Sequence, residues 1–155
     1  MTTFLGDTDS KLDTKGRFLF PSAMRKQLGD EAAERGFVLK KSIFKNCLEL
    51  HPMTEWEDLV AKIRKKLNPF NKEHNAFLSQ FHRGIAELSL DGSGRLLMPK
   101  RLMDLAGISR DIVLSGVGGM IEVWSEDEYS KANMSDTAFE ALAGNVLGSD
   151  FSLND

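Results

Sequence analysis

Two short segments of the chain carry the same charged residues at the same spacing. LDTKGRFLFP and LDGSGRLLMP lie 78 positions apart, and each has an aspartate followed four residues later by an arginine. The first pair is Asp13 and Arg17, and the second is Asp91 and Arg95. An aspartate at the start of a turn accepts backbone N–H bonds and can hold a guanidinium by a charge-assisted bond. An arginine fixed in this way can pair with O6 and N7 of guanine in DNA.

A purely structural interpretation of these segments is a turn closed by a surface ion pair. Both copies also keep a glycine before the arginine, Gly16 or Gly94, and a proline four residues after it, Pro21 or Pro99. A shared folding unit would keep such residues too, so duplication is compatible with either interpretation. The match extends well beyond the turns, and this favours nucleic-acid recognition.

The two turns differ at the residue that precedes the glycine. Lys15 stands in the first turn and Ser93 in the second. A lysine contributes phosphate contacts, which add affinity but no sequence information. We therefore expect the first turn to bind DNA more strongly than the second.

The segments that follow each turn predict a repeated unit of strand, turn, strand, short helix, strand, turn, strand and helix. PSAMRKQLG and PKRLMDLAG each place a proline at a helix start and a glycine at its end. FVLK with CLELHP, and DIVLSG with MIEVWS, supply the later strands. TEWE and SEDE then predict capping boxes at the last helices. The first copy has an additional connection, DEAAERG.

We divide the chain into four parts on this basis. The first repeat with its helix spans 7–67, a connecting helix lies in 68–85, and the second repeat spans 86–131. The acidic tail, 132–155, should be partly disordered, with a helix near 136–143.

The composition is that of an ordinary globular protein. Of the 155 residues, 41% are hydrophobic and 28% are charged, and no apolar run approaches the roughly 18 residues of a membrane span. The N-terminal residues lack the features of a secretory signal, and Cys47 is the only cysteine. We expect a cytoplasmic protein in a reducing compartment, with Cys47 as a small core residue in a strand.

The formal net charge of −3 conceals an uneven distribution. Residues 11–48 contain nine Lys/Arg and four Asp/Glu, whereas residues 122–155 contain eight Asp/Glu and one lysine. A basic N-terminal half is therefore compatible with a nucleic-acid partner, because salt screens the distant acidic tail.

Other chemistries find little support in the sequence. His51, His74 and His82 lack the additional ligands of a zinc site. GVGG at 116–119 lacks the Lys-Ser/Thr of a phosphate loop, so a hairpin turn is expected there. Because no serine lies in a nucleophile elbow, we expect no catalytic residue, no metal and no cofactor, and a protein that is not an enzyme.

Taken together, LDTKGRFLFPSAMRKQLG, LELHPMTEWEDL, LDGSGRLLMPKRLMDLAG and IVLSGVGGMIEVWSEDEY resemble the MraZ family, from about Phe4 to Lys131. Each half is similar to the AbrB-type swapped-hairpin domain. The resemblance implies an α+β fold of two tandem swapped-hairpin β-barrel halves. These halves would carry short helices, would be related by a pseudo-twofold axis and would be joined by connecting helices.

The resemblance also implies a function. The family consists of transcriptional regulators, usually repressors, of the division and cell-wall gene cluster. They recognise short G/T-rich direct repeats in double-stranded promoter DNA as a ring-shaped homo-oligomer associated with the nucleoid. DNA contact is carried onto Arg17 and Arg95, with Asp13 and Asp91 as orienting partners and Lys15 at the basic position. Two further cations complete the predicted DNA-binding set: Lys11 and Arg25.

A rival interpretation is a ring-forming interaction module, or an AbrB-type antitoxin-like protein, whose turns grip a protein partner. DEAAERG and the tail after Asn133 depart from the family pattern. The acidity of the tail could cover the basic surface, although we favour a role in keeping the assembly soluble.

Overall fold

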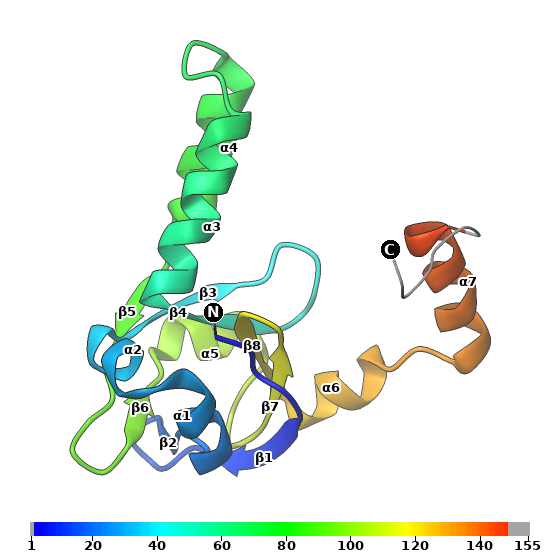
Figure 1. The fold of residues 1–155 in the computed structure, drawn as a ribbon. Helices are drawn as coiled ribbons and strands as arrows, with labels where there is room; N and C mark the ends of the chain where they lie inside the picture. The colour runs from blue at the N-terminus through cyan, green and yellow to red at the C-terminus, as the bar shows by residue number, and fades with distance from the viewer. Residues whose placement is uncertain (1, 149–155) are drawn as a thin grey trace.

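The computed structural model describes residues 2–148, which form two antiparallel sheets and seven helices (Figure 1). The strands are β1 (Asp7–Lys11), β2 (Arg17–Leu19), β3 (Phe37–Lys41), β4 (Leu48–Pro52), β5 (Ala86–Leu88), β6 (Arg95–Leu97), β7 (Asp111–Val117) and β8 (Met120–Ser125). The helices are α1 (Ser22–Leu28), α2 (Asp30–Arg35), α3 (Met53–Lys66), α4 (Lys72–His82), α5 (Lys100–Leu105), α6 (Glu126–Ala132) and α7 (Asp136–Leu147).

The order of elements confirms the repeated unit, with two corrections. DEAAERG is not a plain connection, because six of its residues form α2 between Gly29 and Gly36. The capping box at TEWE is wrong: α3 begins directly after Pro52, so Thr54 is already inside the helix. The cap at SEDE is correct in that the Ser125 side chain accepts a bond from the Glu128 N–H.

The sheet topology confirms the pseudo-twofold relation. The larger sheet has the strand order β1-β7-β8-β4-β3-β5, and exchanging each strand for its counterpart in the other repeat reproduces this order reversed. Equivalent residues then face each other at the axis: Glu49 opposite Glu122 between β4 and β8, and Phe18 opposite Leu96 between β2 and β6.

The two repeats exchange strands within this sheet. β1 of the first repeat pairs with β7 of the second, and β5 of the second pairs with β3 of the first. The α+β class and the swapped halves are thus confirmed, but the expected barrel closure is wrong. The larger sheet stays open at β1 and β5, and β2 with β6 forms a separate ribbon.

The main core lies between this ribbon and the larger sheet. Phe18 and Leu96 point inward from the ribbon and are 1% and 0% exposed. They meet fully buried side chains of the sheet such as Phe37, Leu50 and Ile121. Burying a side chain of this size contributes about 1.5–3 kcal/mol, so the core fixes the ribbon firmly.

A helical hairpin of α3 and α4 rises from one face of the sheet and projects well beyond it (Figure 1). The apolar residues of α3 pack around Trp56, which stacks on Phe81 of α4 with ring centroids 5.3 Å apart. The connecting helix expected in 68–85 is α4, and the Asn71 side chain caps it by accepting bonds from the N–H groups of Glu73 and His74.

The C-terminal helices leave the body on another side (Figure 1). α6 packs against β7 and β8, whereas α7 has no buried residue. The expected helix near 136–143 is present and is longer, since it continues to Leu147. The predicted disorder of the final residues concerns positions outside the described range.

Three smaller expectations can also be compared with the structure. GVGG contains the turn between β7 and β8, as predicted. Cys47 is fully buried as expected, but it lies just before β4 rather than in a strand. Burial raises the pKa of its thiol to about 12. Within residues 2–148, no helix combines the length and apolarity needed to cross a membrane.

Candidate nucleic-acid interface

The first turn is closed by backbone and side-chain bonds centred on Asp13. The Asp13 N–H donates to Arg17 O at 2.8 Å, and the Gly16 N–H donates to Asp13 O at 3.0 Å. Asp13 Oδ1 accepts from the backbone N–H groups of Lys15 and Arg17, each at 2.9 Å. Asp13 Oδ2 accepts from Arg17 Nε, also at 2.9 Å. The guanidinium is therefore held by its own turn, as the sequence predicted.

The second turn repeats the backbone geometry. The Asp91 N–H donates to Arg95 O at 2.9 Å, and Gly94 N–H donates to Asp91 O at 3.0 Å. Asp91 Oδ1 accepts from the N–H groups of Ser93 and Arg95 at 2.8 and 2.9 Å. Gly16 and Gly94 have φ values of +87° and +77°, which explains why both turns keep a glycine there.

The side chain of Arg95 departs from expectation. Among the described residues its guanidinium makes no hydrogen bond to Asp91, the orienting partner predicted from the sequence. Instead Arg95 Nη1 lies 3.8 Å from Asp13 Oδ2 of the other turn. Two arginines from different repeats thus converge on one carboxylate. The sequence of either turn alone does not reveal this contact, because the contact depends on how the two repeats pair.

The pairing of β2 with β6 creates this convergence. Arg17 lies opposite Leu97, and Leu19 lies opposite Arg95. Because side chains alternate along a strand and the central residues Phe18 and Leu96 point into the core, these four residues occupy the outer face. The Leu19 and Leu97 side chains are unusually exposed for leucine, at 56% and 54%. The Arg17 and Arg95 side chains are 36% and 45% exposed.

The pKa values of both aspartates are lowered, which favours their ionised form. The hydrogen bond from the Arg17 N–H lowers the pKa of Asp13, and the Arg17 side chain and the Lys15 N–H lower it further. The Arg95 N–H is the main cause of the lowered pKa of Asp91, and the charge of Arg17 in the other turn also contributes. The site therefore keeps alternating fixed charges at neutral pH.

The remaining cations predicted for this site fall in different places. Lys15 is exposed at the tip of the first turn. Lys11 is exposed at the end of β1, opposite Asp111. Arg25 is on α1, where its Nη2 donates to Asp30 Oδ1 at 2.9 Å, so its charge is already paired.

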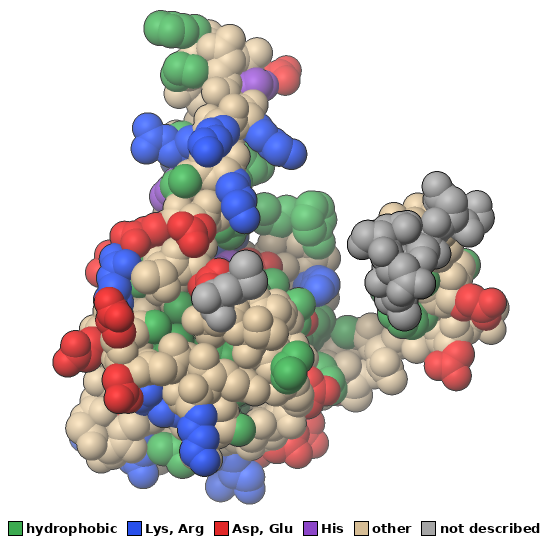
Figure 2. All heavy atoms as spheres, in the orientation of Figure 1, with side chains coloured by type: hydrophobic (Ala, Val, Ile, Leu, Met, Phe, Trp, Pro, Cys, Tyr) green, Lys and Arg blue, Asp and Glu red, His purple; other side chains and the backbone are tan. Residues whose placement is uncertain are grey.

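Sequence reasoning missed two cations beside the first turn. A groove of about 940 Å³ runs along that turn, and Lys15, Lys100 and Arg110 line it. Lys100 also pairs with Asp104 at 2.6 Å. The position of Lys100 after Pro99 in the second repeat gave no signal, since Ser22 occupies the equivalent place in the first. Figure 2 shows blue Lys and Arg side chains gathered at the end of the body that holds the ribbon.

The fold and these paired turns define a class: a duplicated swapped-hairpin protein in which each repeat supplies one turn with an arginine on the outer face of the ribbon. The family model described as "MraZ protein, putative antitoxin-like" matches residues 3–80 and 81–143. The chain therefore belongs to the MraZ family, as its motifs indicated.

Individual relatives agree along nearly the whole chain. A protein of Flavobacterium psychrophilum named transcriptional regulator MraZ is 43% identical over 150 residues, covering 96% of this chain and 94% of the relative. Proteins of the same name from Christiangramia forsetii and Cytophaga hutchinsonii are 41% and 37% identical, covering 97% and 95% of this chain and 96% of each relative. These names place the chain among transcriptional regulators and confirm the prediction of a non-enzymatic class.

Proposed function

We propose that this protein is a sequence-specific repressor that binds double-stranded DNA through the outer face of the β2–β6 ribbon and its two turns. Its targets are short G/T-rich direct repeats in the promoter of the division and cell-wall gene cluster. The observation that carries the proposal is the convergence of Arg17 and Arg95 on Asp13.

The ribbon has the shape and chemistry that base recognition requires. The major groove of B-DNA admits a two-stranded β-ribbon, and a bidentate arginine there selects guanine by about 1–3 kcal/mol. The braced guanidinium of Arg17 loses little side-chain freedom on binding. Exposed Leu19 and Leu97 beside the arginines suit apolar contact with thymine methyl groups. This pairing of residues fits a site rich in guanine and thymine.

The surrounding cations supply affinity. Lys15 at the turn tip and Arg110 in the adjacent groove would contact phosphates, whereas Lys100 in the same groove already pairs with Asp104. Asp13 and Asp91 orient the turns, and Lys11 is a further candidate at the end of β1. Arg25 is the weakest member of the predicted set, because Asp30 pairs with it.

Assembly and cell location complete the proposal. Repeats 7–67 and 86–131 each give one turn to the DNA-binding face, while 68–85 joins them and 132–155 forms the tail. Several copies in a ring would bind successive repeats together, which raises avidity by roughly 10²–10⁴ when the spacing fits. Such a protein would work in the cytoplasm on the nucleoid.

A gel-shift titration on the promoter upstream of the protein's own gene tests this proposal. Arg17→Ala should lower affinity for the promoter at least tenfold, because a bidentate contact is lost. Arg64→Ala is the matched control, since it removes the same charge from α3, away from the ribbon. It should bind the promoter as the wild type does.

The rival role as a toxin-directed or other protein-binding module predicts a different outcome. If wild-type protein binds its promoter no better than unrelated DNA of equal length, the turns serve a protein partner and the repressor proposal is wrong. If Arg17→Ala and Arg64→Ala weaken binding equally, affinity is only electrostatic and the assigned contact is wrong.

A further inference from the structure

Helix α7 is amphipathic, and none of its residues is buried. Its apolar residues recur at helical spacing along one side, and they remain exposed: Phe139 at 62%, Leu142 at 42%, Val146 at 72% and Leu147 at 50%. Asp136 and Glu140 lie along one edge of this stripe, and the helix contains no basic residue. Such a helix presents an apolar, acidic surface that the described part of its own chain does not cover.

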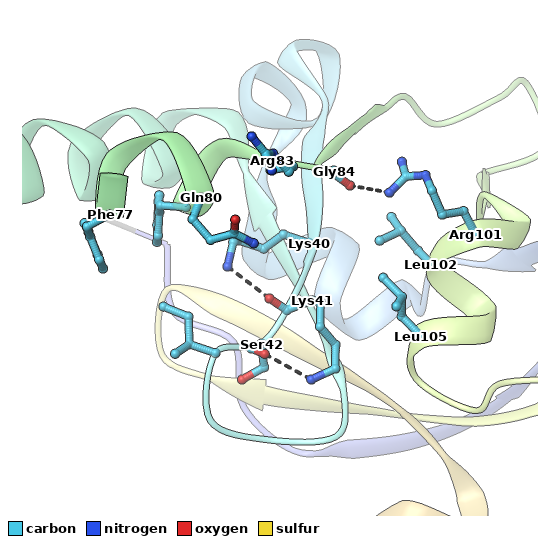
Figure 3. Close-up of a pocket in the computed structure, with 12 residues that line it drawn as sticks. Lys40, Lys41, Ser42, Phe77, Gln80, Arg83, Gly84, Arg101, Leu102 and Leu105 are labelled. Carbon is cyan, nitrogen blue, oxygen red and sulfur yellow. Dashed lines mark hydrogen bonds between the residues drawn. The ribbon is translucent and has the colours of Figure 1, made fainter. Parts of the chain in front are cut away.

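A groove of opposite character lies between the end of β3, the end of α4, and α5. Its volume is about 370 Å³, and it combines apolar and cationic side chains. The cations are Lys40, Lys41, Arg83 and Arg101. Figure 3 shows side chains from both sides of the groove, with Phe77 and Gln80 at one end and Leu102 and Leu105 across from them.

The cations of this groove form no close ion pair with the residues that the structure describes. Among residues 2–148, none of the four cations has a carboxylate oxygen within 4 Å of its nitrogen atoms. Lys40 Nζ donates to Lys41 O at 3.0 Å and lies 4.7 Å from the centre of the Phe81 ring. Arg101 Nη1 donates to Gly84 O at 2.7 Å. These acceptors carry no charge, so an incoming carboxylate would add an ion pair that the carbonyl oxygens cannot supply.

Lys40 is the most buried of the four cations, at 6% exposed. Burial lowers the pKa of its ammonium group, whereas the charge of Glu49, its cross-strand neighbour on β4, raises it. An acidic side chain placed in the groove would stabilise the charged form and offset this desolvation.

The rim of the groove is apolar and accessible. Phe77, Ile43 and Leu105 are 43%, 57% and 57% exposed. The β3–β4 loop continues the surface with Phe44, which is 92% exposed. The groove thus offers an apolar rim around unpaired cations, which complements the apolar stripe and flanking acids of α7.

We propose that α7 of one copy docks in this groove of a neighbouring copy and so clasps the subunits of the assembly. The inference rests on the proposed oligomer and names one of its contacts. A head-to-tail contact of this kind uses two different surfaces and closes into a ring when the rotation fits. Helix α7 is poorly placed to reach the groove of its own chain. The preceding helix, α6, packs against β7 and β8, and β4 separates these two strands from β3, which lines the groove.

Two matched substitutions on α7 test the clasp in the full-length protein. Phe139→Asp places a charge in the apolar stripe, whereas Ala141→Asp places the same charge on the opposite side of the helix. Light scattering at micromolar concentration should show a smaller particle for Phe139→Asp and an unchanged particle for Ala141→Asp. Equal masses for wild type and Phe139→Asp would overturn the proposal, as would a wild type that is monomeric.

Disulfide trapping identifies the partner surface directly. One chain carries Phe139→Cys and a differently tagged chain carries Leu105→Cys, and the two are mixed and oxidised. Buried Cys47, with its raised pKa, should not interfere. A mixed disulfide between the tagged chains supports the clasp. The proposal is wrong if the major product joins two Phe139→Cys chains, or if a chain carrying both cysteines cross-links only within itself.

Loss of the clasp and loss of the DNA contact can be distinguished, because the two contacts use different residues. Arg17 belongs to neither α7 nor the groove, so Arg17→Ala should keep the wild-type particle size. Phe139→Asp should keep weak binding to a single repeat and lose the roughly 10²–10⁴-fold gain on adjacent repeats.

Discussion

Asp13 is the residue whose carboxylate meets the arginines of both repeats. Its carboxylate accepts bonds from two backbone N–H groups and from Arg17 Nε, and it faces Arg95 across the ribbon. Asp91 keeps only the backbone part of this arrangement. The two repeats therefore share a fold but differ in charge pairing. The aspartate of the first turn pairs with the arginine side chain of its own turn, and the aspartate of the second turn does not.

Replacing both turn aspartates by asparagine should change how stability responds to acid. In the folded protein the pKa of each carboxyl is lowered, so each contributes stability above the unfolded value of about 3.9 and loses it as pH falls through the folded value. The free energy of unfolding of the wild type should therefore fall more steeply below pH of about 4 than that of the Asp13→Asn/Asp91→Asn variant.

Urea unfolding at several pH values measures this difference. Asp58→Asn is a suitable control, because the Asp58 carboxylate on α3 accepts no hydrogen bond from the described residues. If the double variant and the wild type lose stability in parallel as pH falls, the carboxylates do not brace the turns.

The unequal turns also predict unequal salt dependence of DNA binding. Lys15→Ala should lower the magnitude of the slope of log affinity against log salt by about one, because one phosphate contact is lost. Ser93→Lys, which copies the first turn into the second, should raise it by about one. Fluorescence anisotropy across a salt series gives both slopes, and an unchanged slope for Lys15→Ala would remove Lys15 from the phosphate contacts.

At the scale of elements, the strand exchange depends on tight backbone approaches. Gly36 has a φ of +85°, and a Cβ added there would lie 2.7 Å from Leu88 O of β5. Gly36→Ala should thus destabilise the protein by about 1–3 kcal/mol, through backbone strain and displacement of β5 from β3.

Gly92→Ala provides the matched control in urea unfolding. A Cβ at Gly92 meets no atom within 4 Å, and Thr14 stands at the equivalent place in the first turn. Its effect on the free energy of unfolding should stay within about 0.5 kcal/mol. Equal effects of the two substitutions would show that the approach of β5 to Gly36 is not needed.

Most elements could be predicted from the sequence because their signals are local. Proline and glycine bound α1, and the segments CLELHP and MIEVWS mark β4 and β8. The family resemblance also implied the pseudo-twofold relation. Local signals failed at α2, whose six residues lack an apolar period. They also failed at Thr54, because the residue that caps the helix is Pro52, two positions earlier.

The candidate site was only half predictable for the same reason. The Asp13–Arg17 bond joins residues four apart and follows from turn chemistry. The approach of Arg95 to Asp13, and the exposure of Leu19 and Leu97, arise from pairing between repeats. Pairing between distant strands gives no signal in the local sequence. The segments RFL and RLL, each with an apolar central residue, are nevertheless compatible with such pairing.

Across the whole molecule, charge is segregated by place. The basic turns lie at the ribbon end of the body, while the acidic helices α6 and α7 leave it elsewhere (Figures 1 and 2). A net charge of −3 therefore hides a cationic face that can meet DNA and an acidic arm that can meet the cationic groove of another copy. One distribution of charge would thus serve both proposed contacts.

The most direct test of the central claim asks whether Arg17 meets guanine N7 in the major groove. Methylation interference first identifies the contacted guanines of the promoter repeat. Replacing one of them by 7-deazaguanine removes the N7 acceptor and should weaken wild-type binding about tenfold. Arg17→Ala should bind the two duplexes equally. If Arg17→Ala still loses the same factor at every such guanine, another group reads the base and the assignment is contradicted.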